Sequence, residues 1–268
     1  MKTKRFLYIT TLLLIGILIS CKSTTKEQSK EVPAQWVQLF NGKDLKDWKI
    51  KIKGHPLNEN YKNTFRVVDG VMQVNYEEYE TFDASFGHIF YKNEYSNYKF
   101  RMEYRFTGEQ VEGGAGWAKR NSGVMIHSPA PETMTLDQDF PISIEVQLLG
   151  GLGEGERSTA NLCTPGTHVV MNDKLFTPHC TPSSSKTFHG DQWVQLEIIV
   201  YNDSLISHKI NGEQVLSYSK PQVGGKNVKT DPKILESLQG KPLKKGYISL
   251  QSESHPVEFR KIEILDLN

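Results

Sequence analysis

The sequence shows no excess of either charge and no internal repeat. Its 32 Lys and Arg residues against 31 Asp and Glu residues leave a net charge of +1. Proteins that bind nucleic acids usually carry a basic patch, and partners of polycations carry an acidic run. The balanced charge therefore argues against both kinds of partner. We expect the charged residues on a solvated outer face.

Long apolar runs are also scarce, and the only one stands at the N-terminus. It extends from Phe6 to Ile19 without a charged residue and follows Lys2, Lys4 and Arg5. A basic start before an apolar stretch of this length is typical of a secretory signal peptide, because a comfortable helical span needs about 20 apolar residues. A plain transmembrane anchor is the alternative.

The apolar run ends in Leu18-Ile19-Ser20-Cys21, which resembles the lipobox of bacterial lipoproteins. In such proteins the cysteine is diacylated and becomes the mature N-terminus, and its lipid chains hold the protein on a membrane face without spanning it. The following residues are polar and patternless, as expected of a flexible tether. The sequence thus predicts a lipoprotein signal peptide over 1–20, a lipidated Cys21 with its tether over 21–34, and one domain over 35–268.

Cysteine is rare, with three residues in the chain. If Cys21 is lipidated, Cys163 and Cys180 remain as a single pair, and an exported protein provides the oxidising compartment for a disulfide. Such a bond would hold a loop in place. The alternative is a metal site, because His168 and His179 are close by in the sequence. One Cys–His neighbour pair lacks the spaced ligand doublets of structural zinc, so the disulfide is favoured and no metal is expected.

Strand-like alternation of apolar and polar residues dominates the rest of the chain. Two hairpins are indicated by the favoured turn dipeptides Asp69-Gly70 and Asn211-Gly212. Further strands are expected over 98–106, 193–201, 246–251 and 257–267. Only Pro232 to Gln239 has a helical pattern. Many short strands between turn signals predict an all-β sandwich of two antiparallel sheets.

Two further predicted strands each combine an apolar face with a polar one. Residues two apart share a face of a strand. Asn121, Gly123 and His127 therefore line one face of the first strand, and Glu145 and Gln147 line one face of the second. This pattern indicates a sheet with the core on one side and a binding site on the other. A half-solvated antiparallel sheet has the same alternation and remains the alternative.

Glycine-rich stretches at 113–116 and 150–155 do not match nucleotide-binding motifs. The first lacks the lysine and hydroxyl of a phosphate loop, and the second has neither the dinucleotide spacing nor a following helix. We expect no cofactor, although a structural cation in a rim loop stays open. Both stretches are predicted to be rim loops. Trp117 at the end of the first is a candidate for stacking on a sugar ring, with a buried rim tryptophan as the alternative.

A series of short motifs then follows in a fixed order. They are FNGKDLKDW at 40–48, VDGV at 68–71, YSNYKFRMEYR at 95–105, NSG at 121–123, EVQ at 145–147, DQW at 191–193, NG at 211–212, GYISLQ at 246–251 and VEFRKI at 257–262. In this order they resemble the 3-keto-disaccharide hydrolase-like family, also described as 3-keto-glucoside 1,2-lyase or 3-keto-2-hydroxy-glucal hydratase domains. The resemblance covers nearly all of residues 35–267.

The resemblance implies a concanavalin A-like jelly roll whose concave face holds carbohydrate. Such proteins are often lipoproteins of Bacteroidetes-type bacteria, so we expect a lipid anchor in the outer membrane, on its periplasmic or cell-surface face. The chain departs from the family at two positions. Many members carry arginine where His127 stands and a tyrosine near the place of His168.

The chemistry implied by the resemblance is cleavage of 3-keto-glycosides by β-elimination and hydration. A ketone at C3 acidifies the hydrogen on C2, so one base, one acid and donors for the enolate suffice. Glu145 is the candidate base or acid, with His127 or His168 as its partner. The candidate substrate-binding residues are Asn121, Gln147, Arg120, Trp117 and His179.

Other mechanisms and functions are weighed against this one. A conventional glycosidase needs two carboxylates, and of the carboxylates only Glu145 lies on an inward-facing predicted strand. The alternative function is a non-catalytic carbohydrate-binding lipoprotein, because a fold does not by itself decide function.

Overall fold

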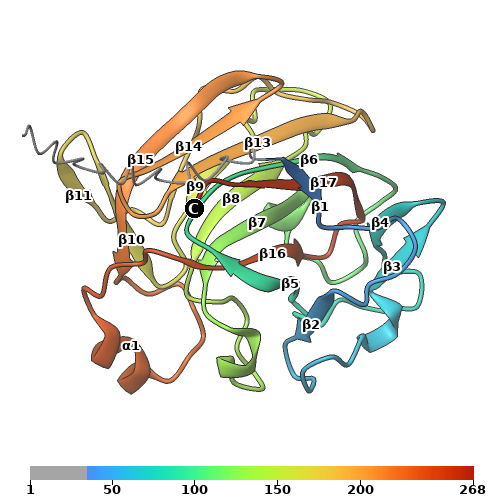
Figure 1. Ribbon diagram of the computed structural model, residues 1–268. Helices are drawn as coiled ribbons and strands as arrows, with labels where there is room; N and C mark the ends of the chain where they lie inside the picture. The colour runs from blue at the N-terminus through green and yellow to red at the C-terminus, as the bar shows by residue number, and fades with distance from the viewer. Residues whose placement is uncertain (1–34) are drawn as a thin grey trace, which may run out of the picture. The chain divides into compact units, whose positions relative to one another are not determined.

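The computed structural model describes residues 35–268, which form two antiparallel β-sheets packed face to face (Figure 1). The predicted signal peptide, Cys21 and the tether lie outside the described residues. The predicted all-β sandwich is confirmed, and within the described residues the one α-helix is α1 (Pro232–Leu238), at the predicted place. No helix in this part of the chain is long and apolar enough to cross a bilayer.

The first sheet has seven strands. In spatial order they are β12 (Cys180–Thr181), β9 (Asn161–Cys163), β8 (Ile144–Leu149), β7 (Asn121–Ser128), β16 (Gly246–Ser252), β5 (Gly87–Tyr95) and β2 (Trp48–Ile52). The two strands predicted to have mixed faces, β7 and β8, are therefore neighbours near the middle of this sheet.

The second sheet has ten strands. Its spatial order is β11 (Lys174–Phe176), β10 (Thr167–Met171), β15 (Glu213–Val223), β14 (Leu205–Ile210), β13 (Val194–Tyr201), β6 (Asn97–Phe106), β17 (Val257–Asp266), β4 (Val71–Val74) and β3 (Phe65–Val68), with β1 (Trp36–Gln38) paired to β17. The hairpins β3–β4 and β14–β15 turn at the predicted dipeptides. The single-turn 3-10 helices are η1 (Tyr61–Asn63), η2 (Gly116–Ala118) and η3 (Pro131–Thr133).

The hydrophobic core lies between the two sheets. Alternate residues of β6, such as Tyr98 and Phe100, are buried against residues such as Val124 of β7 and Val146 of β8. Burying one such side chain contributes roughly 1.5–3 kcal/mol to stability. One face of β7 and β8 packs in this core. The other side chains of these strands therefore lie on the opposite face, away from the ten-stranded sheet.

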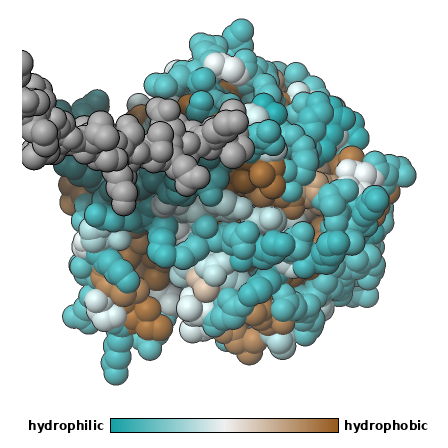
Figure 2. Space-filling model, in the orientation of Figure 1, coloured by the Kyte–Doolittle hydropathy of each residue, from teal (hydrophilic) through white to brown (hydrophobic). Residues whose placement is uncertain are grey.

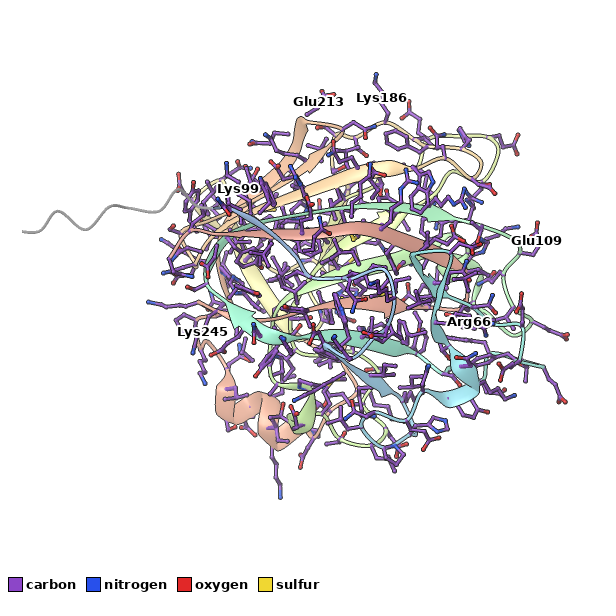
Figure 3. All side chains as sticks on the ribbon, turned by 45° about the vertical axis from the view of Figure 1, so that its right-hand side comes forward. Arg66, Lys99, Glu109, Lys186, Glu213 and Lys245 are labelled. Atoms are coloured by element: carbon purple, nitrogen blue, oxygen red, sulfur yellow. A yellow bond between two sulfur atoms is a disulfide. The ribbon has the colours of Figure 1, made fainter. Side chains whose placement is uncertain are left out.

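Charged side chains cover the outside of the sandwich. Figure 3 shows Glu109, Lys186 and Lys245 projecting away from the body of the molecule, and all three are exposed. On the face drawn in Figure 2 hydrophilic residues predominate, and the hydrophobic ones form small separate patches. The expected solvated outer face is therefore present.

Candidate active site

The face of the seven-stranded sheet that is turned away from the core, called here the open face, carries polar side chains in register. Strand pairing aligns neighbours across the sheet in two rows. One row is Ser249, Met125, Glu145, Cys163 and Cys180; the next holds Gly123, Gln147 and Asn161. Strand pairing therefore brings residues from distant parts of the sequence side by side around Glu145.

A cavity of about 630 Å³ opens over these rows. This volume lies within the range of sites for small molecules. Its lining includes Trp117, Asn121, Glu145, Gln147, Cys163, His179, Cys180 and Glu253, together with Asp139, Phe140, Pro165, Asn227, Val228 and Lys229. Five of the residues selected from the sequence as catalytic or substrate-binding thus meet at one cavity: Trp117, Asn121, Glu145, Gln147 and His179.

Two buried carboxylates share this cavity. Glu145 is 6% exposed and Glu253 is 3% exposed. Burial raises the pKa of Glu145, and burial together with the negative charge of Glu145 raises the pKa of Glu253 well above its usual value. Within residues 35–268 neither carboxylate forms an ion pair, and Oε2 of Glu253 has no hydrogen-bond partner. Because the pKa of Glu145 is raised to about 8, a minority of this carboxyl is ionised near neutral pH and can take a proton, whereas Glu253 keeps its proton and can give it.

Glu253 was missed by the sequence analysis, although a signal for it exists. The alternation along β16 places Ser249 and Gln251 on the open face, and the next residue of the same parity is Glu253. It stands just beyond the last residue of β16, where the backbone is fixed by a hydrogen bond of 2.8 Å from the Ser254 amide to the Tyr76 hydroxyl. Extending the polar alternation by one step would have found the second carboxylate.

Gly123 provides the space that Glu145 occupies. A Cβ atom on Gly123 would lie 2.7 Å from Oε1 of Glu145 and 2.9 Å from its Cγ. Gly123 and Glu145 are diagonal neighbours on adjacent strands, since Gly123 pairs with Gln147 and Met125 pairs with Glu145. The glycine of the NSG motif therefore lets the Glu145 side chain fold over β7 into the cavity.

Trp117 stands at the cavity as an exposed aromatic surface. It is 57% exposed, which contradicts the buried-rim alternative. Its ring stacks nearly parallel on Phe86, with centroids 6.2 Å apart and planes inclined by 12°. Phe86 in turn contacts Phe140, another lining residue, at 5.1 Å between centroids. An aromatic ring held this way can stack on the apolar face of a sugar.

Amide groups complete the polar part of the lining. The Gln147 Oε1 accepts a hydrogen bond of 3.1 Å from Asn161 Nδ2, which leaves the Gln147 NH₂ group to donate to a ligand. Asn121 is buried, and its Oδ1 has no partner among the described residues. Buried polar groups normally find partners, so both amides are suited to bind hydroxyl groups of a ligand.

The predicted pairing of Glu145 with His127 is wrong. His127 has a φ of 55°, and the pairing of β7 with β16 shifts register there, which marks a β-bulge. A bulge interrupts the two-residue alternation on which the prediction rested. The His127 ring instead hydrogen-bonds through Nε2 to the carbonyl of Asn202, on the turn between β13 and β14, and it lines a different cavity.

His168 and Arg120 also lie outside the lining of the Glu145 cavity. His168 belongs to β10 of the ten-stranded sheet, and its ring packs against Gly224, where a Cβ atom would come within 2.6 Å of Nδ1. The Arg120 guanidinium donates to the carbonyl of Gly190 and lies over the Phe106 ring at 5.6 Å. Arg120 therefore anchors a rim loop rather than a ligand.

The two cysteines in the domain form a disulfide that is part of the cavity wall. Cys163 pairs with Cys180 across β9 and β12, and Cys163 is also the cross-strand neighbour of Glu145. The bond fixes His179 at the rim, and burial lowers the pKa of this histidine. The described residues contain no group of three metal-ligating side chains.

Comparisons with known proteins agree with the fold. Among solved structures, a candidate glycosyl hydrolase from Parabacteroides distasonis ATCC 8503 has 17% identity, covers 87% of this chain and 100% of that chain, and gives a TM-score of 0.52. A second candidate glycosyl hydrolase from the same organism has 19% identity, covers 87% and 94%, and gives 0.49. No curated protein matches the chain.

A match to a family model covers most of the domain. The model is described as the 3-keto-alpha-glucoside-1,2-lyase-like domain, and it matches residues 35–265. This range includes both carboxylates, the disulfide and every residue that lines the cavity. The chain therefore belongs to the 3-keto-alpha-glucoside-1,2-lyase-like family.

Proposed function

We propose that the chain cleaves 3-keto-glucosides by β-elimination followed by hydration, with Glu145 as general base and Glu253 as general acid. The observation that carries the proposal is the pair of buried, unpaired carboxylates in one cavity. The family match supports the substrate class. The roles follow from the two pKa shifts, because the charge of Glu145 further raises the pKa of Glu253 and so keeps the proton on Glu253.

In the first step Glu145 removes the proton from C2 of the sugar, in the fraction of molecules where this carboxyl, with its pKa raised to about 8, is ionised. The electrons of the C–H bond move towards the C3 ketone and form an enolate. The C1–O bond then breaks, and Glu253 gives its proton to the departing oxygen. The products are an enone and the free alcohol, and the pair of glutamates has taken one proton and given one.

The second step adds water to the enone. The carboxylate of Glu253 takes a proton from the water molecule while the oxygen of that water bonds to C1. The protonated Glu145 returns its proton to C2. Both glutamates regain their starting states, and the net reaction is hydrolysis. General acid and general base catalysis of this kind typically contribute about 10²–10⁴-fold each.

The remaining lining residues position the sugar. Trp117 offers its ring as a platform, and the Gln147 NH₂ group is available to a hydroxyl or to the enolate oxygen. Asn121 adds an unpaired buried amide oxygen. His179, which also lines the cavity, is the proposed contact for the leaving group.

The test is incubation of the chain with matched methyl glucosides and methyl 3-keto-glucosides of both anomers. We expect enone absorbance and alcohol release from the keto substrate alone, and loss of both in Glu145→Gln. Turnover of the unoxidised glucoside would point to a two-carboxylate glycosidase instead. If neither substrate reacts while calorimetry detects saccharide binding, the protein is a carbohydrate-binding module and the catalytic proposal fails.

We further propose that the protein is exported and anchored through lipid chains on Cys21 in an outer membrane. The support is the basic and apolar N-terminal sequence that ends in Leu18-Ile19-Ser20-Cys21. Metabolic labelling with a radioactive fatty acid should mark the wild-type chain and not Cys21→Ser. Labelling of both chains would contradict the assignment of Cys21.

A further inference from the structure

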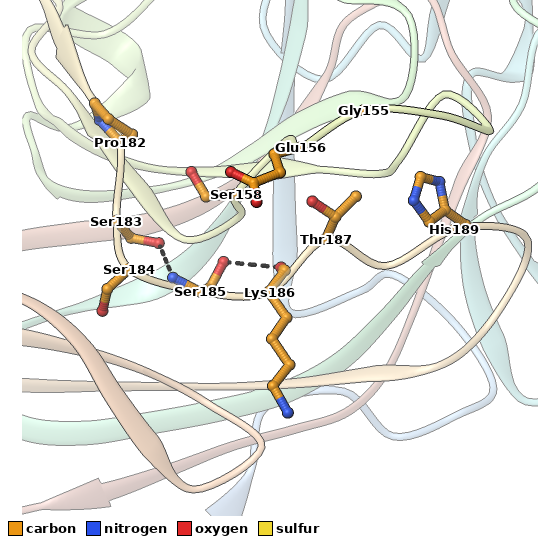
Figure 4. A pocket seen from close by; sticks show the side chains of 10 residues that line it. All are labelled: Gly155, Glu156, Ser158, Pro182, Ser183, Ser184, Ser185, Lys186, Thr187 and His189. Carbon is orange, nitrogen blue, oxygen red and sulfur yellow. Dashed lines mark hydrogen bonds between the residues drawn. The ribbon is translucent and has the colours of Figure 1, made fainter.

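A second, larger depression lies next to the Glu145 cavity. It has a volume of about 810 Å³ and runs between residues 155–158 and residues 182–189 (Figure 4). Hydroxyl side chains dominate its lining, from Ser158, Ser183, Ser184, Ser185 and Thr187. We call it the serine groove.

The serine groove lies beyond β12, at the edge of the seven-stranded sheet. Cys180 of β12 lines the Glu145 cavity, and Pro182, two residues further along the chain, lines the groove. Asn161 joins the two sites. Its Nδ2 donates to Gln147 in the cavity at 3.1 Å, and its Oδ1 accepts from the Ser158 hydroxyl at 2.8 Å and from the Ser183 amide at 2.9 Å. Asn161 is itself buried and lines neither site, so it is a structural link that holds Gln147 of the cavity close to Ser158 and Ser183 of the groove.

The wall of the groove is rigid. Ser183 donates to the Thr159 carbonyl at 2.6 Å, and Ser185 donates to the same carbonyl at 2.9 Å. Ser184 donates to the carbonyl of Val215 at 3.1 Å. Ser183 Oγ also accepts from the Ser185 amide at 3.0 Å, and Ser185 Oγ accepts from the Thr159 amide at 2.7 Å. These bonds fix the hydroxyl oxygens and leave each of the two one lone pair for a ligand. Polar groups held in place before binding reduce the entropy that a ligand loses.

The chemistry of the lining selects for neutral polyhydroxy compounds. None of the described residues that line the groove is Phe, Tyr or Trp, so an aryl group would find no stacking partner. Figure 4 shows the Lys186 side chain pointing away from Glu156 and Ser158, so it adds no positive charge beside them. Fixed hydroxyls, the carboxylate of Glu156 and the ring of His189 suit the hydroxyl groups of sugars rather than an anion.

We propose that the serine groove is a set of distal sugar subsites, so that the substrates are oligosaccharides longer than a disaccharide with the 3-keto unit at the end held by Glu145 and Glu253. This inference rests on the proposed function for its account of the reacting end. The groove itself binds the unmodified sugars that follow, and its affinity is measurable without any turnover.

The test is a calorimetric titration of the full chain with glucose oligomers of two, three and four units, in both α-1,4 and β-1,4 linkage. Three proteins are compared: wild type, Glu156→Trp and Glu154→Trp. Glu156 lines the groove, whereas Glu154 is exposed on the same loop outside the lining. The first indole would occupy part of the groove and obstruct the sugars there, and the second is the matched control.

For one linkage we expect the wild type and Glu154→Trp to bind the tetramer at least tenfold more tightly than the dimer. Glu156→Trp should lose this gain with length. Equal affinity for dimer and tetramer in the wild type, or an unchanged gain in Glu156→Trp, overturns the groove. A gain with length in a wild type that does not react with 3-keto-glucosides would instead uphold the groove and reject the proposed reaction.

Discussion

Glutamates lie on the outward faces of both sheets, but their surroundings differ. On the ten-stranded sheet, Glu258 is 8% exposed, nearly as buried as Glu145 at 6%. Its Oε2 accepts from Arg105 Nε at 2.6 Å, and its Oε1 accepts from Gln73 Nε2 at 2.7 Å. Glu145 has neither kind of partner within the described residues. The two glutamates are thus almost equally buried, but only Glu258 has a positively charged partner.

The same contrast holds for the other glutamates of these faces. Glu103 is bonded to both Arg260 and Lys261, and although burial raises its pKa, these two hydrogen bonds lower it below the usual value. Burial raises the pKa of Glu253 as well, but its charged neighbour is Glu145, which raises this pKa further instead of lowering it. A carboxylate paired with a base stabilises the sheet, whereas an unpaired one in a cavity is kept at a cost to stability. That cost indicates a role in chemistry.

The largest expected effect separates Glu253 from Glu258. Glu253→Gln should lower kcat on a 3-keto-glucoside by roughly 10²-fold or more, because the acid that protonates the leaving oxygen is gone. Its melting temperature should not fall. Glu258→Gln should keep full kcat but lose about 1–3 kcal/mol of stability, since Arg105 then loses its charged partner. Steady-state kinetics and thermal melts check both, and a reversed pattern would refute the division between the two faces.

The next effect concerns the space beside Glu145. Gly123→Ala should lower kcat at least tenfold, because the new methyl group would overlap the Glu145 carboxylate and move it. Overpacking of this kind costs about 1–3 kcal/mol of stability. Gly116→Ala is the control, since a Cβ atom there meets nothing within 4 Å. Equal activity of the two variants in the same assay would show that Glu145 need not occupy its present position.

A smaller effect is expected in the pH dependence of stability. The pKa of Glu253 is raised in the folded protein above its ordinary value of 4.5, so the folded state holds more protons than the unfolded state above that pH. Stability is then lost as pH rises from 4.5 towards the folded pKa. In thermal melts between pH 4 and pH 8, the melting temperature of Glu253→Gln relative to that of the wild type should rise with pH.

Glu103→Gln should behave in the opposite way. Its pKa is lowered on folding, so the stability that it contributes is present above 4.5 and is lost as pH falls through the folded value. The deficit of Glu103→Gln against the wild type should therefore shrink on acidification. Parallel pH profiles for the two variants would remove the electrostatic distinction between the faces.

The smallest effect is expected from an exposed ion pair. Lys261, whose side chain is 63% exposed, shares Glu103 with Arg260. Lys261→Gln should cost less than about 1 kcal/mol, because water screens the pair and Arg260 remains. Urea unfolding measures this change, and kcat should stay at the wild-type value. A loss of stability as large as that of Glu258→Gln would mean that solvent exposure does not determine how much these ion pairs contribute to stability.

Much of the fold could be predicted because the relevant signals are local. The alternation in β6, the turns at Asp69-Gly70 and Asn211-Gly212, and the short helix α1 depend on neighbouring residues only. The same alternation predicted a shared polar face for Glu145 and Gln147, and the structure places both at one cavity.

The position of His127 was predicted wrongly because it depends on a contact between distant residues. The bulge that turns His127 away is matched by Gly246, where a Cβ atom would come within 2.4 Å of the His127 carbonyl carbon. The residues near His127 in the sequence contain no signal that predicts its contact with Gly246. Glu253 was missed because its strand ends one residue earlier, and its approach to Glu145 arises from the pairing of β16 with β7 and of β7 with β8.

The disulfide beside Glu145 makes the shape of the cavity depend on the redox state of its surroundings. Strand β12 is joined to β9 through only two residue pairs, Cys180 with Cys163 and Thr181 with Leu162. Without the covalent bond, this short edge would hold the wall of the cavity weakly. Reduction of Cys163–Cys180 would therefore loosen the wall of the cavity, so the shape of the site depends on an oxidising environment.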